Sequence, residues 1–139
     1  MIDYIISTDK NKLDIKAIHD FLTNRSYWAK GRSLETVKRS IDNSLCFGMY
    51  DNSDRLIGFA RAVTDFATYA YIMDVFILED FRNNGLGKKL VEGIVQHPDL
   101  KGLQRIMLAT KDAHGLYEKY GFKVTVIPDK LMEIVNKPQ

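Results

Sequence analysis

The sequence predicts one domain of the α/β class, spanning residues 1–139 and built on a mixed sheet. The chain is 139 residues long, which is about the size of one domain. Segments with hydrophobic residues at helical spacing alternate with segments whose hydrophobic period is two. A strand, helix and strand in succession from residue 68 to 110 imply a right-handed parallel crossover, whereas the preceding strands form an antiparallel meander.

The first half is expected to hold two helices among short strands. Asp14 and Ser33 each precede hydrophobic residues at helical spacing, and their side chains can cap a helix N-terminus. The segment "NRSYWAKGR" at residues 24–32 breaks this period and is predicted to be a loop. The expected strands are residues 2–6, 44–51 and 55–65, the last two forming a hairpin around a turn at 52–54.

The second half begins with an almost uninterrupted apolar run, "TYAYIMDVFIL" at residues 68–78. Such a run is typical of a central strand that is covered on both faces. A helix with one apolar side follows from Gly85 and ends at Pro98.

The C-terminal part is expected to add three strands and one short helix. Asp112 can cap that helix, and Gly121 can terminate it. The expected strands are residues 103–110, 122–127 and 131–135, the last two joined by a turn at Pro128–Asp129.

Composition excludes several classes of function. The chain is 45% hydrophobic and 27% charged, which is typical of soluble globular proteins. A net charge of +2 is too small to indicate a nucleic-acid partner. Cys46 is the lone cysteine, so no intramolecular disulfide can form, and no Cys/His spacing indicates a metal site. Neither a signal peptide nor a membrane-length apolar stretch is evident, so a cytoplasmic protein without membrane contact is expected.

The stretch "FRNNGLGKKL" at residues 81–90 joins a predicted strand to a predicted helix. Such a loop exposes unpaired helical N–H groups at the positive end of the helix dipole, where phosphate binds well. Glycines at 85 and 87 allow the backbone to approach a ligand closely. Leu90 stands where a Rossmann fingerprint needs its third glycine, and the P-loop spacing is absent. By itself, R-x-x-G-x-G is equally the pattern of a plain turn into a helix.

Two longer segments, "VFILEDFRNNGLGKKLVEGI" and "LQRIMLATKDAHGLYEKYGFKV", together resemble the GNAT (GCN5-related) superfamily of N-acetyltransferases. That family has Q/R-x-x-G-x-G/A after a long strand, then a strand and a short helix with A-x-x-L-Y-x-x-x-G-F. The second motif is matched here by Ala113, Leu116, Tyr117, Gly121 and Phe122. "SYWAKGR" further resembles small, stand-alone members. The resemblance implies a GNAT-like mixed, mostly antiparallel sheet with a central splayed parallel strand pair, flanked by about four helices.

The resemblance also implies acetyl-coenzyme A as the acyl donor. Backbone N–H groups from Asn83 or Asn84 through Lys88 would hold the pyrophosphate, with Arg82 as a charge partner, and Lys88 or Lys89 could meet the 3′-phosphate. Thr110 stands where many members carry Asn, and Glu79 and Asp80 replace the usual proline before the arginine. The implied cofactor-binding residues are Val75, Phe76, Ile77, Arg82, Asn83, Asn84, Gly85, Leu86, Gly87, Lys88 and Thr110.

Tyr117 and Asp74 are the expected catalytic residues. Tyr117 matches the family's tyrosine that protonates the departing thiolate, although packing, as for Tyr120, is the alternative. A phenol with a pKa of ~10 suits that proton transfer. Asp74 interrupts an apolar strand, and an unpaired buried carboxylate is costly. It is therefore either a buried partner of Arg61 or His114, or a cleft residue that binds the substrate ammonium or accepts its proton through water.

The acceptor site is expected between the loop at residues 24–32 and the end of the second hairpin strand. Asp65, Asp74 and Asp112 favour a cationic amine, either a small molecule or a peptide amino group. The expected function is N-acetyl transfer by direct attack; the alternative is a non-catalytic coenzyme A-binding sensor or partner module. Monomer and homodimer both remain open, with the C-terminal strands able to pair across a dimer. The expected acceptor-binding residues are Tyr27, Trp28, Arg32, Arg61, Asp65 and Phe66.

Overall fold

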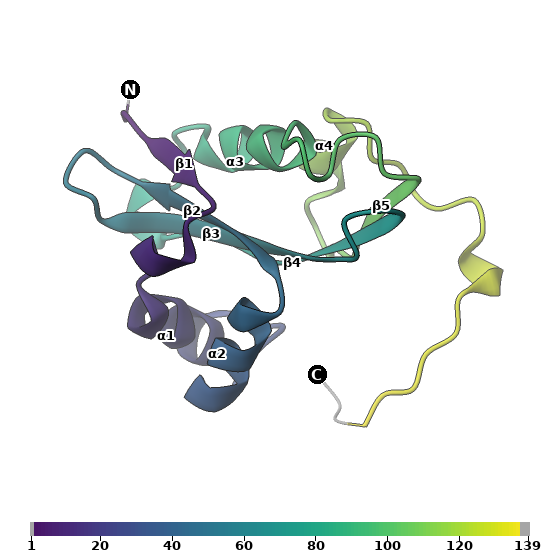
Figure 1. Ribbon diagram of the computed structural model, residues 1–139, viewed down its shortest axis with the longest axis horizontal. Coiled ribbons are helices and arrows are strands. Elements are labelled where there is room, and N and C mark those ends of the chain that lie inside the picture. The colour runs from purple at the N-terminus through teal and green to yellow at the C-terminus, as the bar shows by residue number, and fades with distance from the viewer. Residues whose placement is uncertain (1, 137–139) are drawn as a thin grey trace.

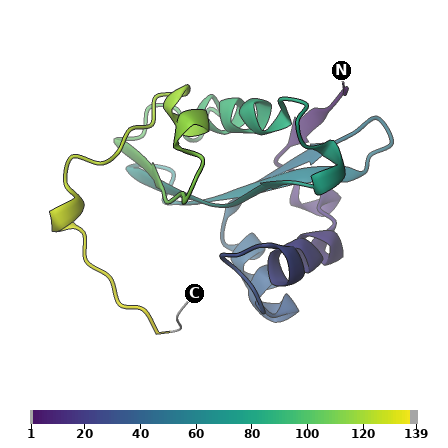
Figure 2. The ribbon, with the colours of Figure 1, turned by 180° about the vertical axis from the view of Figure 1, so that it is seen from behind.

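A five-stranded sheet lies between two layers of helices in the computed structural model, which describes residues 2–136 (Figure 1). The strand order is β1-β2-β3-β4-β5, antiparallel throughout except for the parallel pair β4–β5. Helices α1 and α2 cover one face, and α3 and α4 lie on the other (Figures 1 and 2). The predicted α/β class with a mostly antiparallel sheet is confirmed. The elements are β1 (Ile5–Ser7), α1 (Ile15–Arg25), α2 (Leu34–Asp42), β2 (Leu45–Tyr50), β3 (Leu56–Thr64), β4 (Tyr69–Ile77), α3 (Leu86–Val95), β5 (Arg105–Leu108) and α4 (His114–Glu118).

The predicted caps of the first two helices are confirmed. The Asp14 carboxylate accepts the Ala17 N–H at 3.0 Å, and the Ser33 hydroxyl accepts the Thr36 N–H at 3.1 Å. The predicted cap at Asp112 is wrong. The Thr110 hydroxyl accepts the Ala113 N–H at 3.0 Å, and Ala113 itself occupies the N-cap position of α4. The short helix therefore begins one residue later, and the Asp112 side chain is not used to start it.

Two hydrophobic cores, one on each face of the sheet, hold the helices in place. On the first face, Phe21 of α1 stacks on Phe76 of β4 with ring centroids 4.0 Å apart. On the second face, Leu90 and Ile94 of α3 pack against a cluster that includes Ile57 and Ile72. Since β4 contributes to both cores, its alternating residues fix the position of helices on both sides.

A β-bulge in β4 separates this strand from β5. Phe59 pairs with Phe76 and Arg61 with Met73, so β4 carries one extra residue between these pairs. Asp74 lies in the bulge with a φ of 55°, a left-handed value that is uncommon for a residue other than glycine. Beyond it, β4 leaves its parallel neighbour, because β5 pairs only with Tyr69–Ile72. The separation of β4 from β5, which the family resemblance implied, is therefore present.

The two predicted C-terminal strands are not formed within the described residues. Residues 122–127 lack strand pairing, Pro128–Lys130 form a 3-10 turn, and residues 131–136 run away from the sheet (Figures 1 and 2). The prediction failed because a strand needs a partner for its N–H and C=O groups, and this segment lies beside none in its own chain. The predicted strands at 2–6 and 103–110 are shorter than expected, being β1 and β5.

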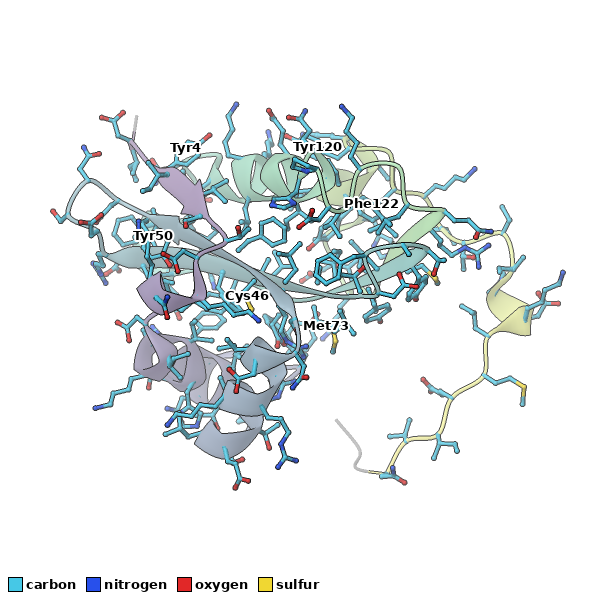
Figure 3. The ribbon with its side chains drawn as sticks, viewed as in Figure 1. Tyr4, Cys46, Tyr50, Met73, Tyr120 and Phe122 are labelled. Carbon is cyan, nitrogen blue, oxygen red and sulfur yellow. The ribbon has the colours of Figure 1, made fainter. Side chains whose placement is uncertain are left out.

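Cys46 and Tyr50 lie in the core between the sheet and the helices α1 and α2 (Figure 3). Burial raises the pKa of the Cys46 thiol from 9.0 to about 11. Burial also raises the pKa of the Tyr50 phenol from 10.0 to about 12. Both groups therefore keep their protons in the folded chain at pH values where the unfolded chain releases them.

We predict that stability falls with rising pH from about pH 9, where the Cys46 thiol ionises in the unfolded chain only. Between pH 9 and 11 this group alone removes about 2 kcal/mol of unfolding free energy. Cys46→Ala is expected to be less stable at pH 7 because of its cavity, and yet to lose less stability on alkalinisation. Urea unfolding at several pH values measures how the unfolding free energy of each protein changes with pH. An equal loss in the unmodified protein and in Cys46→Ala would contradict the prediction.

Candidate functional site

Two adjoining cavities open where β4 separates from β5. The first, of about 500 Å³, lies beside the turn that enters α3, and we call it the glycine-loop groove. The second, of about 260 Å³, lies beside residues 71–75 of β4 and residues 108–110 at the end of β5, and we call it the strand pocket. Both cavities are lined by Tyr27, Trp28, Val75, Asp112, Ala113 and Tyr117. A ligand can therefore extend from one into the other.

The turn at residues 82–88 presents a row of unpaired backbone donors to the glycine-loop groove. Gly85 is the N-cap of α3 with a φ of 75°, and Asn83 has a φ of 66°. The Asn84 side chain donates to the Phe81 and Arg82 carbonyls at 3.2 and 3.0 Å, which fixes the turn. Within residues 2–136, the N–H groups of residues 83–88 make no hydrogen bond. These donors lie at the positive end of the α3 dipole, which suits an anion.

Basic side chains surround this turn. The Arg82 Nε donates to the Ile77 carbonyl at 3.0 Å, so the guanidinium is held beside the groove. The proximity of the Lys88 side chain and its like charge lower the pKa of Lys119. Lys88 and Lys119 are thus neighbours, whereas Lys89 lies 3.9 Å from the Glu92 carboxylate. The structure favours Lys88 over Lys89 as an anion contact and adds Lys119, which no sequence pattern indicated.

Tyr117 lines both cavities from α4. Its ring meets Phe122 edge to face at 5.7 Å, and the residue is only partly exposed. Burial is the main cause that raises the pKa of Tyr117, and nearby Tyr27 adds to it. The phenol is therefore protonated at neutral pH and can donate a hydrogen bond into either cavity.

Thr110 lies in the strand pocket, in the loop between β5 and α4. Its hydroxyl oxygen accepts the Ala113 N–H at 3.0 Å, so the hydroxyl proton stays available for donation. A threonine in the position of the family's usual asparagine therefore still offers one donor to the cavity.

The Asp74 carboxylate is fully buried and accepts three hydrogen bonds. Its Oδ1 accepts from the Trp28 indole at 2.8 Å, and its Oδ2 accepts from Arg32 at 2.8 Å and from Arg61 at 2.6 Å. Of the alternatives considered from sequence, the structure has Asp74 as a buried partner of Arg61 and also places it at the wall of the strand pocket. His114 is not among its partners.

The other expected acceptor-binding residues divide into two groups. Tyr27 and Trp28 line both cavities. Arg32 and Arg61 line neither, because both guanidinium groups are directed at Asp74.

Asp65 and Phe66 also line neither cavity and instead form the turn between β3 and β4. The Asp65 carboxylate accepts hydrogen bonds from the Thr68 hydroxyl and from the N–H groups of Ala67, Thr68 and Tyr69, which lower its pKa. This carboxylate therefore stabilises its own turn.

Several lining residues were not expected from sequence. Arg25 lies at the end of α1, where it pairs with Glu79 at 2.8 Å and borders the glycine-loop groove. Asp112, which the sequence indicated both as a helix cap and as an acid of the acceptor site, lines both cavities. Its position in the second motif was the available signal, whereas Arg25 has none, because a charged residue at a helix end is common. The further unexpected lining residues are Phe21, Tyr71, Ile72, Met73, Phe81, Leu108, Ala109, Ala113 and Leu116.

Residues 15–122 match the sequence profile of the family described as "Acetyltransferase (GNAT) family". An "Uncharacterized N-acetyltransferase ycf52" of Pyropia yezoensis is 33% identical over 125 residues, covering 86% of this chain and 70% of that protein. The protein of the same name in Gracilaria tenuistipitata var. liui is 36% identical, covering 76% of this chain and 61% of that protein. The chain thus spans less than two thirds of the length of the latter relative.

Solved structures agree with these sequence matches. The crystal structure of a Xanthomonas campestris protein assigned to the GNAT family is 47% identical, with a TM-score of 0.93 over 97% of this chain and 94% of that one. Glucosamine-6-phosphate N-acetyltransferase of Arabidopsis thaliana, at 19% identity and a TM-score of 0.65, shares the fold.

The part of the chain that the structure describes offers neither a membrane span nor a metal site. None of the helices there combines the length and apolar character that a membrane crossing needs. Nor do three or more His, Cys, Asp or Glu side chains gather there in an arrangement that could hold a metal ion.

We predict that Asp74→Ala lowers the unfolding free energy by about 3–5 kcal/mol, because it leaves the largely buried Arg61 and Arg32 guanidinium groups unpaired. Glu35→Ala is the matched control, since Glu35 pairs with Arg39 on the surface at 3.7 Å and should cost about 0.5 kcal/mol or less. Urea titration of both variants measures the difference. An Asp74→Ala protein as stable as the control would contradict a structural role for the network.

Proposed function

The chain belongs to the GNAT family of acetyltransferases, and from this membership we propose that it transfers an acetyl group from acetyl-coenzyme A to an amine. The observation that carries the proposal is the position of Tyr117. Tyr117 lines both the glycine-loop groove, which contains the anion-binding turn, and the adjoining strand pocket. This junction is where an acetyl donor bound in the glycine-loop groove would meet an amine bound in the strand pocket. A group that can donate a proton therefore lies at the reacting atoms.

The glycine-loop groove suits the phosphates and the pantetheine arm of acetyl-coenzyme A. The unpaired N–H groups of residues 83–88 supply donors for a pyrophosphate, with Lys88 and Lys119 nearby as cations. Val75, Phe76 and Ile77 follow the point where β4 loses its β5 partner, so this edge of the strand is free for amide pairing. When bound there, acetyl-coenzyme A supplies an activated acetyl thioester.

Gly87 supports this assignment because the protein's own packing does not require glycine there. Its φ is not positive, and a Cβ at this position would meet only Leu116 Cδ2, at 3.9 Å. A methyl group at residue 87 would therefore fit the folded chain but extend into the groove that residue 87 lines. A need for close approach by a ligand accounts for glycine at this position.

Different groups of the chain contribute to different steps of acetyl transfer. Tyr117 holds its proton at neutral pH, because burial raises its pKa, and donates that proton to the leaving sulfur. The amine loses one proton as the amide forms, and water in the open cavity accepts that proton and returns one to the Tyr117 phenolate. Backbone N–H groups on the free edge of β4 polarise the carbonyl oxygen in the manner of an oxyanion hole. The walls of the two cavities hold the reactants in contact, which supplies much of the rate enhancement of a direct attack.

Asp74 acts as a positioning residue in this proposal. Three donors occupy its two oxygens, and its side chain is fully buried although the residue borders the strand pocket, so the carboxylate is already engaged within the protein. It instead holds Trp28 and Arg32, and through them the loop that walls both cavities. The expected role of Asp74 as a base is therefore not carried forward.

The acceptor we propose is an amine with an apolar or aromatic body. Of the three acids expected to attract a cation, Asp74 is paired with two arginines and Asp65 is bound within its own turn. Asp112 remains as the acid beside both cavities. Tyr27, Trp28 and Tyr71 supply aromatic surface in the strand pocket, which suits an apolar body with its amino group near Asp112.

We predict that Gly87→Ala weakens acetyl-coenzyme A binding by about tenfold or more, because the added methyl group enters the groove. Gly115→Ala is the matched control, since Gly115 also has a helical φ and open space around its Cβ position. Calorimetric titration gives the affinities, and the ligand-induced rise in melting temperature gives an independent readout. No rise at millimolar acetyl-coenzyme A in the unmodified protein would sink the donor assignment.

We predict that Tyr117→Phe lowers kcat by about 10²-fold while the KM for acetyl-coenzyme A is preserved, because only the proton donor is lost. Tyr120→Phe should retain full activity, since Tyr120 lines neither cavity. Thiol release across a panel of aliphatic and aromatic amines measures turnover. If the protein binds acetyl-coenzyme A but releases no thiol with any amine, the alternative of a non-catalytic binding module replaces the enzyme.

A further inference from the structure

Lys111 places a positive charge beside the strand pocket. Its ammonium lies over the Tyr27 ring, with Nζ 5.4 Å from the ring centroid, and Tyr27 lines the pocket. Thr110 and Asp112, the residues on either side of Lys111 in the chain, line the pocket as well. Within residues 2–136, Lys111 forms no ion pair. Since Lys111 is exposed, its ammonium can keep the aromatic contact and still bind an anion.

The charged groups around the strand pocket do not balance one another. Asp74 borders the pocket, and its one carboxylate is paired with the guanidinium groups of both Arg32 and Arg61. This buried cluster therefore carries one net positive charge. Lys111 and Asp112 add charges of opposite sign at the mouth of the pocket. The surroundings are positive overall, and a ligand whose charged group is an amine alone leaves that charge uncompensated.

The strand pocket has the size and the walls for one small aromatic molecule. An apolar cavity of about 150 Å³ holds benzene, so the strand pocket, at about 260 Å³, has room for a ring with several further atoms. Tyr27 and Trp28 meet edge to face at 5.1 Å, and the Trp28 indole donates to Asp74 at 2.8 Å. These contacts hold the aromatic wall in place before a ligand arrives, which lowers the entropic cost of binding.

We propose that the acceptor is a free α-amino acid with an aromatic or large apolar side chain, and that Lys111 binds its carboxylate. This assignment rests on the proposed function, because it specifies the acceptor of the same acetyl transfer. The ligand's side chain lies against Tyr27 and Trp28, its amino group lies beside Asp112, and its carboxylate meets the Lys111 ammonium. Lys111 and Asp112 are consecutive residues, which suits a ligand that carries both charged groups on one carbon.

Lys111 contributes to binding in this assignment and takes no part in the chemical step. The neutral amino nitrogen forms the amide bond while the carbon–sulfur bond breaks, Tyr117 protonates the sulfur, and water takes the proton that the nitrogen loses. The carboxylate keeps its charge from substrate to product. Lys111 therefore stabilises the bound substrate and the transition state equally, and its loss should raise the KM for the amino acid without lowering kcat.

The first test is calorimetric titration of the full chain with phenylalanine and with phenylalaninamide, in the absence and presence of coenzyme A. The two ligands share the ring and the amino group and differ in the carboxylate. We expect phenylalanine to bind about tenfold more tightly, the effect of one hydrogen bond between charged groups. The dipeptide phenylalanyl-alanine, in which an amide follows the first α-carbon, should bind as weakly as phenylalaninamide. This comparison separates a free amino acid from a peptide N-terminus.

Three variants locate the carboxylate contact. Lys111→Met removes the charge but keeps a side chain of similar length over Tyr27, and should abolish the preference for phenylalanine. Lys111→Arg should retain the preference. Lys38→Met, which changes an exposed lysine on α2, is the control that should bind as the unmodified protein does. The assignment is overturned by equal affinities in the unmodified protein, by no binding of phenylalanine at millimolar concentration, by a dipeptide that binds as tightly as phenylalanine, or by a preference that persists in Lys111→Met.

The second test is thiol release from acetyl-coenzyme A with the same ligands. In Lys111→Met we expect the KM for phenylalanine to rise about tenfold at an unchanged kcat. Equal kcat/KM for phenylalanine and phenylalaninamide in the unmodified protein would overturn the carboxylate contact and leave the proposed acetyl transfer intact. Thiol release with neither ligand, together with the calorimetric preference for phenylalanine, would overturn the proposed function and support the carboxylate contact. The two failures are therefore distinguishable.

Discussion

The buried carboxylate of Asp74 connects three parts of the molecule that lie far apart in the sequence. It accepts hydrogen bonds from Trp28 and Arg32 on the loop after α1, and from Arg61 on β3. Asp74 also lies in the bulge where β4 turns away from β5, at a φ of 55° that carries a strain cost. Three hydrogen bonds to an ionised group offset that strain, and breaking them would leave two guanidinium groups unpaired. One residue therefore fixes both the splay of the strands and the loop that covers it.

The site follows from this splay more than from any single side chain. β5 ends at Leu108 while β4 continues to Ile77, so the second half of β4 keeps a free edge inside the molecule. The N-terminus of α3 and its turn approach that edge from one side, with unpaired N–H groups. Tyr27 and Trp28 approach from the other side. The crossover through α3 makes β4 and β5 parallel neighbours, and the chain leaving β5 then places α4, and with it Tyr117, at the point where both sides meet.

Sequence reasoning succeeded where the signal was local. Asp14 and Ser33 cap their helices because a capping residue acts on N–H groups three positions away. The glycine turn was found for the same reason, since its residues are contiguous. The pairing of Asp74 was left among alternatives, because Arg32 and Trp28 lie 42 and 46 residues away in the sequence. Lys119 lies near Lys88 only because α4 packs beside α3. Asp112 does not cap α4, because the Thr110 hydroxyl accepts the N–H of Ala113 at the same end of the helix.

The C-terminal strands illustrate what a strand pattern specifies. Alternating apolar residues at 131–135 require a neighbouring strand edge, but the pattern contains nothing about which chain provides it. β5 is an edge that lacks a neighbour, and Met132 and Ile134 are side chains that lack a surface, in the same molecule. In this chain the extended residue Leu131 follows the 3-10 turn at Pro128–Lys130 and carries residues 131–136 outward rather than back toward β5. The alternating pattern at 131–135 is therefore present without the hydrogen-bonding partner that would make it a strand.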